Sequence, residues 1–140
     1  MSPRRLATGA LLAASACAHG LTAGLSEADE LYRLAIVSLS GVRFTPDRPV
    51  CLAVAGGDPT PALLAAVRAR VPKALPKSQC PTRTFANAIA QSNHQWLELG
   101  RIYLDQSGVA SFGWTENFGL GGTCNVQPPG AEYRVFCMGI

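Results

Sequence analysis

Three titratable side chains in the second half of the chain are of the types that acid–base catalysis uses: His94, Glu98 and Glu116. Two carboxyl groups held close together can share one proton, so that one acts as an acid and the other as a base. A histidine acts as a general base when a nucleophile and an orienting carboxylate lie beside it, and Ser92 and Asp105 are of the right types. These residues indicate one candidate activity, that of a small hydrolase.

The two glutamates meet only in one register of a predicted hairpin. The segment "DQSG", Asp105 to Gly108, favours a type I turn followed by a left-handed glycine, which sets Asp105 opposite Val109. Counting back sets Glu98 opposite Glu116, which is destabilising unless a cation or a shared proton lies between them. A slip of one residue would instead pair Glu98 with Thr115. The first register also predicts the pairs Ile102–Phe112, Gly100–Trp114 and Trp96–Phe118, with Trp114 over the bare backbone of Gly100.

The chain lacks the short motifs that accompany most catalytic sites. Gly-x-Ser-x-Gly, Ser-x-x-Lys and His-Glu-x-x-His are absent from the sequence. The stretch "NFGLGGTC" has Cys124 where a dinucleotide-binding loop has its last glycine, so we expect a connection between two strands. The sequence therefore predicts no cofactor.

The chain has five cysteines, an odd number that cannot all pair in disulfides. Cys17 lies in an N-terminal segment that resembles an export signal, described below, and we assign it to that segment. Cys51, Cys80, Cys124 and Cys137 then remain, and four cysteines in an oxidising compartment indicate two disulfides with three alternative pairings. We favour Cys51 with Cys80, and Cys124 with Cys137, because the second pair flanks the turn "QPPG". A zinc site would need short spacings such as Cys-x-x-Cys, which the chain lacks, so no metal is expected.

The N-terminus has the composition of a secretory signal. Arg4 and Arg5 precede an uncharged apolar run from Leu6 to Ala18, about 13 residues where a membrane-spanning helix needs roughly 20. Small residues before Cys17 and before His19 suit a signal peptidase. "ASAC" also resembles the lipobox of bacterial lipoproteins, with Ala14 where leucine is usual, and this resemblance implies a lipid on Cys17. The signal is thus 1–18, or 1–16 with Cys17 retained, and 19–140 form one globular domain.

The charge balance excludes one class of partner. Two of the 12 Lys and Arg residues lie in the signal, which leaves ten against nine Asp and Glu. The remaining cations are scattered and form no stripe that could follow phosphates, so we expect no nucleic-acid binding. Contact with a membrane would come only through a lipid on Cys17.

Two helices are predicted before residue 73. The first is expected to start at Ser26, with Asp29 three residues on, and to end at Gly41. Apolar residues on both of its sides indicate either a deeply buried helix or an extended second half. The second helix has Thr60 as N-cap and Pro61 at its first position, and Pro72 ends it.

Strands make up most of the rest. "RPVCLAVAGG", 48–57, reads as a buried strand, and "KALPKSQCPT" as a loop. Beyond Thr84, four strand-like runs alternate with turns: "WLELGRIYLD", "VASFGWTENF", "GTCNVQ" and "EYRVFCMGI". This order indicates an α+β domain, with one or two N-terminal helices packed on a mostly antiparallel sheet of about four to five strands.

The stretch "DPTPALLAAVRARVPKALPKSQC", with the later "EYRVF", resembles small exported bacterial proteins of uncharacterised function, a resemblance that implies no activity. We expect a non-catalytic domain that binds a protein or another envelope component, in the periplasm, lipid-anchored to the outer membrane, or secreted. One alternative is a small periplasmic hydrolase that uses Glu98 and Glu116, or His94. Another is an inhibitor of an extracellular hydrolase, with a protruding loop such as Gly119 to Thr123.

Overall fold

The computed structural model describes residues 24–81, 93–107, 109–117, 119–127 and 134–139. The predicted signal with Cys17, the candidate nucleophile Ser92, the turn residue Gly108 and Phe118 lie outside these residues.

Both described helices begin where the sequence predicts. In α2 (Glu27–Arg43) the Ser26 hydroxyl accepts a hydrogen bond of 3.1 Å from the Asp29 N–H. In α3 (Pro61–Arg68) the Thr60 hydroxyl accepts one of 3.2 Å from the backbone N–H of Leu63. These side-chain oxygens satisfy N–H groups that the first helical turn leaves without a partner.

The ends of the helices differ from the prediction. Helix α2 is helical throughout, without an extended second half, and continues past Gly41 to Arg43. Its apolar residues on two sides are explained by its two sets of contacts, since α2 packs against both the sheet and α3 and buries Leu31, Ala35, Ile36 and Leu39. Helix α3 ends at Arg68, four residues before Pro72.

In the described part of the chain the sheet has seven strands, more than the four to five predicted. It is mostly antiparallel, but β1 is parallel to both β2 and β3. Two strands that the sequence did not predict separately account for the higher number. Part of the predicted loop forms β2 and the 3-10 helix η1, and one predicted strand is divided into β3 and β4. In order across the sheet the strands are β2 (Ala74–Pro76), β1 (Val50–Val54), β3 (Gln95–Leu99), β5 (Ala110–Glu116), β6 (Gly121–Gln127) and β7 (Arg134–Gly139); β4 (Tyr103–Leu104) also pairs with β5, and η1 spans Lys77–Gln79.

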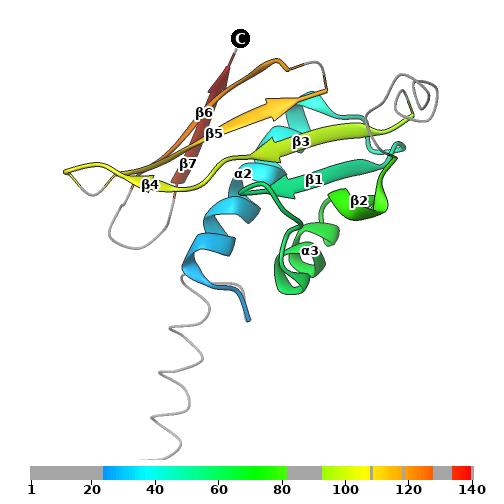
Figure 1. The fold of residues 1–140 in the computed structure, drawn as a ribbon, viewed down its shortest axis with the longest axis horizontal. Coiled ribbons are helices and arrows are strands. Elements are labelled where there is room, and N and C mark those ends of the chain that lie inside the picture. The colour runs from blue at the N-terminus through cyan, green and yellow to red at the C-terminus, as the bar shows by residue number, and fades with distance from the viewer. Residues whose placement is uncertain (1–23, 82–92, 108, 118, 128–133, 140) are drawn as a thin grey trace, which may run out of the picture.

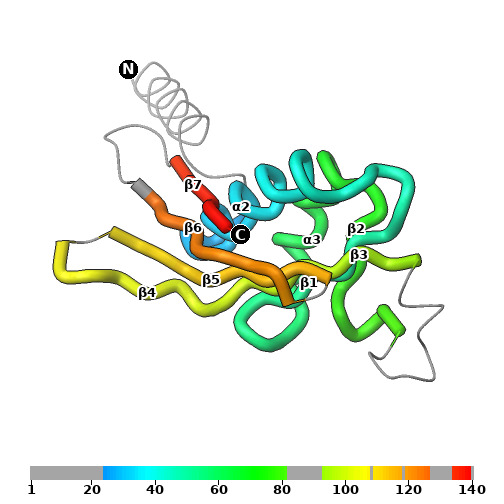
Figure 2. The backbone as a smooth tube through the Cα atoms, turned by 90° about the horizontal axis from the view of Figure 1, so that it is seen from above, coloured from blue at the N-terminus to red at the C-terminus, as the bar shows by residue number. Residues whose placement is uncertain are grey.

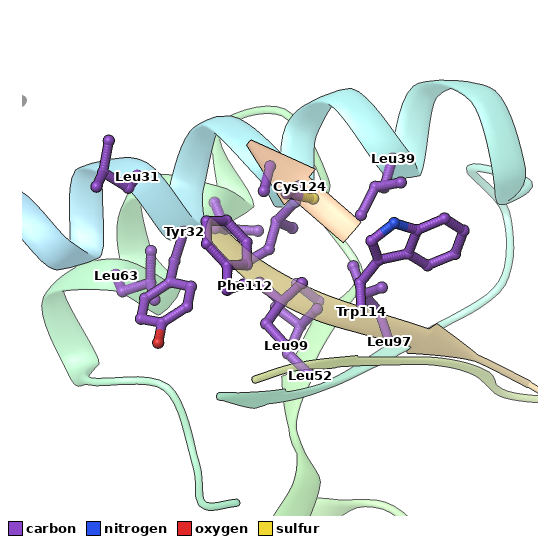
Figure 3. Close-up of a cluster of buried hydrophobic side chains, with 14 of the residues drawn as sticks. Leu31, Tyr32, Leu39, Leu52, Leu63, Leu97, Leu99, Phe112, Trp114 and Cys124 are labelled. Carbon is purple, nitrogen blue, oxygen red and sulfur yellow. The ribbon is translucent and has the colours of Figure 1, made fainter. Parts of the chain in front are cut away.

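Both helices lie on one side of the sheet, which we name the helix face (Figure 1). The core fills the space between them, with alternate strand residues pointing into it. In Figure 3, Tyr32 and Leu39 of α2 lie over Phe112, Leu97 and Leu99 of the sheet. At the far edge, β7 runs beside α2 (Figure 2).

A β-bulge divides the predicted hairpin. Next to the turn the predicted register is confirmed, since Tyr103 pairs with Ser111 and the Asp105 N–H donates to the Val109 carbonyl at 3.0 Å. Further along, the Gly100 N–H donates to the Gly113 carbonyl at 2.8 Å. Two residues on one strand, Arg101 and Ile102, therefore stand against Phe112 alone, the pattern of a bulge.

The bulge shifts by one residue every pair that lies farther from the hairpin turn. Glu98 pairs with Thr115, which is the slipped register, and the predicted pairing of Glu98 with Glu116 is wrong. The predicted pairing of Gly100 with Trp114 is wrong for the same reason, because Trp114 lies opposite Leu99. Its indole instead lies over Gly139, and its N–H donates to the Met138 carbonyl at 3.3 Å.

Both favoured disulfides are present in the structure. Cys51–Cys80 joins β1 to the residue after η1, and Cys124–Cys137 joins directly opposed residues of β6 and β7, with Cα atoms 4.0 Å apart. Such bonds are typical of proteins outside the reducing cytosol. No helix in the described part of the chain is long and apolar enough to span a membrane.

Candidate functional site

Glu98 and Glu116 lie on opposite faces of the sheet. Because side chains alternate along a strand, the one-residue shift turns Glu116 toward the helix face and Glu98 away from it. The Glu116 carboxylate accepts a hydrogen bond of 2.9 Å from Arg43, whose guanidinium lies 4.7 Å from the centre of the Trp114 ring. The two carboxylates therefore form no pair that could share a proton.

The other predicted catalytic residues are also dispersed. His94 is half-buried just before β3, and Asp105 lies at the hairpin turn, where its carboxylate accepts hydrogen bonds from Ser107 and from the Val109 N–H. An aspartate that holds a turn together in this way is an ordinary structural element. Of the described residues, no three His, Cys, Asp or Glu side chains are grouped closely enough to hold a metal ion.

The side of the sheet opposite α2 and α3, which we name the open face, has no described α-helix over it, and only the 3-10 helix η1 lies against it among the described helices. Its strand residues are mostly small or polar, and several are exposed. From the strand pairing, the open face carries Cys51, Ala53, Trp96, Glu98, Ser111, Gly113, Thr115, Thr123, Asn125, Phe136 and Met138.

Two cavities adjoin on the open face, and both are lined by Glu98 and Lys77. One has a volume of about 550 Å³ and a floor rich in glycine; the other, of about 620 Å³, has Trp96, Cys80 and Pro81 in its walls. Each volume is within the usual range of ligand pockets. We name the two cavities together the groove. Its glycines are Gly56, Gly57, Gly100, Gly113, Gly119, Gly121 and Gly122.

One wall of the groove is the turn that follows β1. Val54 and Gly57 exchange two backbone hydrogen bonds, of 2.8 and 3.0 Å, around Ala55 and Gly56. Both central residues have positive φ, 50° for Ala55 and 83° for Gly56. This conformation is unfavourable for alanine, so the turn holds a strained residue at the rim of the groove.

A second wall is formed by Asp58 and the residues of η1. The Asp58 carboxylate accepts hydrogen bonds from the Ser78 N–H at 2.9 Å and from the Ser78 hydroxyl at 2.5 Å. These bonds, with a smaller contribution from the Lys77 charge, lower the pKa of Asp58 below its ordinary value. Asp58 is therefore ionised at neutral pH, and the charge of Lys77 acts on it.

Glu98 differs from Asp58, because no described residue is a partner of this kind for its carboxylate. It is half-buried in the middle of the sheet, between Ala53 on β1 and Thr115 on β5. Within the described ranges, neither a hydrogen bond nor an ion pair involves its carboxylate. Charges that are partly removed from water are ordinarily paired, so Glu98 is the group in the groove that most needs a partner.

The sequence pattern alone did not identify the groove. Gly113 offered a signal, because glycine inside a strand is destabilising and often marks a place where a ligand or another backbone approaches closely. A Cβ atom at Gly113 would lie 3.8 Å from the Gly122 carbonyl oxygen, an ordinary contact, so packing within the fold does not require glycine there. Lys77 could not be placed, because it lies in the predicted loop, and Asp58 could not be placed, because it lies in the short connection between the predicted strand 48–57 and the helix that starts at Thr60.

No protein-family model, curated protein sequence or solved structure matches this chain.

Proposed function

We propose that this protein is an exported, non-catalytic binding domain whose ligand lies in the groove on the open face. The observation that carries this proposal is the carboxylate of Glu98, half-buried at the junction of two cavities and without a partner among the described residues. A ligand that supplies a partner there would remove an unfavourable term from the free energy of the folded protein.

The separation of the candidate catalytic residues favours binding over hydrolysis. A carboxylate dyad needs two carboxyl groups within reach of one substrate, and the sheet stands between Glu98 and Glu116. The inhibitor alternative has less support, because Gly121–Gln127 form β6, paired on both sides, and Gly119 and Leu120 alone remain in the turn. The proposal therefore keeps the open face, not a loop, as the contact surface.

The location is part of the proposal. Two disulfides are consistent with an oxidising compartment, and the signal-like segment 1–18, or 1–16 with a lipid on Cys17, would direct the chain there. Intact mass spectrometry of the protein from cell-envelope fractions tests this. We expect a mass with two disulfides that starts at Cys17 with acyl chains or at His19 without them. Four free thiols would contradict the proposed location.

The groove is tested by nuclear magnetic resonance on the isotope-labelled mature protein. The probes are end-blocked pentapeptides of basic, acidic and apolar composition and soluble cell-wall fragments. We expect at least one probe to shift the amide signals of Glu98, Gly100 and Gly113, without being hydrolysed. Release of a hydrolysis product, or shifts confined to surfaces outside the groove, would contradict the proposal.

A matched pair of variants identifies the binding surface. Gly113→Val places a branched side chain in the groove, whereas Ser111→Val places the same side chain on the same strand and face but outside both cavities. We expect the first variant to abolish the amide shifts and the second to keep them. Equal effects of the two variants would place the ligand elsewhere.

A further inference from the structure

The charges that line the groove do not cancel. Asp58 accepts two hydrogen bonds from Ser78, which chiefly lower its pKa, and the charge of Lys77 makes a smaller contribution, while the Glu98 carboxylate has no hydrogen bond or ion pair with any residue the structure describes. Lys77 lines both cavities with Glu98, yet the two do not form an ion pair. The groove therefore presents one uncompensated negative charge at its centre, and its complement is a cation.

The floor beside Glu98 shapes what can reach that charge. Gly100 directly follows β3, and it lies beside Gly113 of β5. A Cβ atom at Gly100 would be 3.5 Å from the Gly113 nitrogen and oxygen. Their backbone hydrogen bond of 2.8 Å leaves little polarity for a ligand to use. A flat floor of this kind suits an unbranched aliphatic chain in van der Waals contact.

We infer that the groove takes a basic side chain, lysine or arginine, of a partner polypeptide. Its cation lies on the Glu98 carboxylate, and its methylene stem lies along Gly100 and Gly113. The polypeptide continues into the cavity walled by Trp96 and Pro81, which is of similar size and open to the same carboxylate. This inference rests on the proposed function and names the chemical class of its ligand.

The first test measures dissociation constants of three end-blocked pentapeptides by isothermal titration and amide shifts. One has lysine at its centre, one norleucine, which keeps the stem without the charge, and one glutamate. We expect the lysine peptide to bind about tenfold more tightly than the norleucine peptide, and the glutamate peptide not to bind. Equal affinities for lysine and norleucine would overturn the inference, as would tighter binding of spermidine than of the lysine peptide.

Glu98→Gln separates the charge from the shape of the groove. It should weaken the lysine peptide about tenfold and leave the norleucine peptide unchanged, whereas Glu27→Gln, an exposed glutamate in the first turn of α2, should affect neither. Lys77→Met removes from the walls of the groove a positive charge that repels the cation of the peptide. The lysine peptide should therefore bind severalfold more tightly, and weaker binding would contradict a cationic ligand.

Failure of the inference can be told apart from failure of the proposed function. If Gly113→Val abolishes binding of some probe while Glu98→Gln leaves it unchanged, the groove is the binding site but its ligand is not a cation. If 10 mM lysine peptide, chosen to detect weak binding, shifts no amide signal of Glu98, Gly100 or Gly113, the inference is overturned. Thermal unfolding of each variant verifies that it is folded.

Discussion

The hydroxyl of Tyr32 donates a hydrogen bond of 2.9 Å to the carbonyl oxygen of Gly100, 68 residues further along the chain. Gly100 is the last residue before the bulge, where the regular ladder is interrupted. The hydroxyl therefore satisfies a backbone group at the bulge and ties helix α2 to the shift that turns Glu98 toward the groove. The Tyr32 ring also meets Phe112 edge-on, with ring centres 5.2 Å apart.

Tyr32→Phe removes this hydrogen bond and keeps the ring. We expect the free energy of unfolding to fall by about 1–2 kcal/mol, because a partly buried carbonyl loses its partner. Urea unfolding of the variant and the wild type measures the difference. A change within about 0.3 kcal/mol would mean that water replaces the hydroxyl without loss.

The stability should also depend on Tyr32 at alkaline pH. Burial, first of all, raises the pKa of Tyr32 above its ordinary value, while a backbone hydrogen bond from Ile102 acts in the opposite direction. A group whose pKa is higher in the folded state contributes stability fully below its unfolded pKa and loses it as the pH rises through the folded pKa. We expect the free energy of unfolding to decline above about pH 10, and less steeply in Tyr32→Phe.

The glycines of the sheet should respond in opposite ways. A Cβ atom at Gly122 would lie 1.8 Å from the Met138 carbonyl oxygen, so Gly122→Ala should destabilise the fold by about 3 kcal/mol. Gly113 has room, so Gly113→Ala should stabilise the fold by about 0.5–1 kcal/mol. Thermal unfolding measures both, and a destabilised Gly113→Ala would show that the fold itself requires this glycine.

Replacement by glutamine should change the stability of the fold differently at Glu116 and at Glu98. Glu116→Gln weakens the contact with Arg43, whose side chain is 27% exposed against 13% for Glu116, and we expect a loss of about 1–2 kcal/mol. Glu98→Gln removes a charge that has no partner among the described residues, and it should leave the stability unchanged or slightly raised. Denaturant midpoints at neutral pH decide this, and a strong loss from Glu98→Gln would reveal a partner within the fold.

Each disulfide should contribute to stability, but only one should affect binding. Replacing Cys51 and Cys80 together by serine opens a loop with a sequence separation of 29 and should cost about 3–4 kcal/mol. Replacing Cys124 and Cys137 should cost about 3 kcal/mol. Because Cys80 lines the groove, the first double variant should lose the binding that the second keeps, under conditions where both are folded.

The parts of the fold that depend on short-range signals could be predicted from the sequence. Ser26 and Thr60 each accept a hydrogen bond from a residue three positions away, and Pro61 follows Thr60 directly, so these residues identify helix starts without any tertiary information. The Cys124–Cys137 pairing followed from a nearby turn in the same way.

Features that arise from distant contacts could not be predicted. The bulge at Arg101 and Ile102 is held from the other side by Tyr32; the repulsion between Glu98 and Glu116 indicated a slip of one residue as an alternative, but nothing in residues 95–116 located the bulge. The parallel pairing of Val50 with Gln95 joins segments 45 positions apart in numbering, and it brings Asp58 and Lys77 to the groove. A single extra residue in one strand then decided which face Glu98 occupies, and with it the whole candidate site.

The position of β3 has a consequence for the order of folding. On one side β3 joins the antiparallel run β5, β6 and β7, whose pairings are close in sequence, and on the other it must find β1 across a long separation. Local pairings form first because their loops are short, so we expect the sheet to grow from its C-terminal strands. If the chain crosses a membrane with its N-terminus first, these strands emerge last, and folding has to wait until translocation is complete.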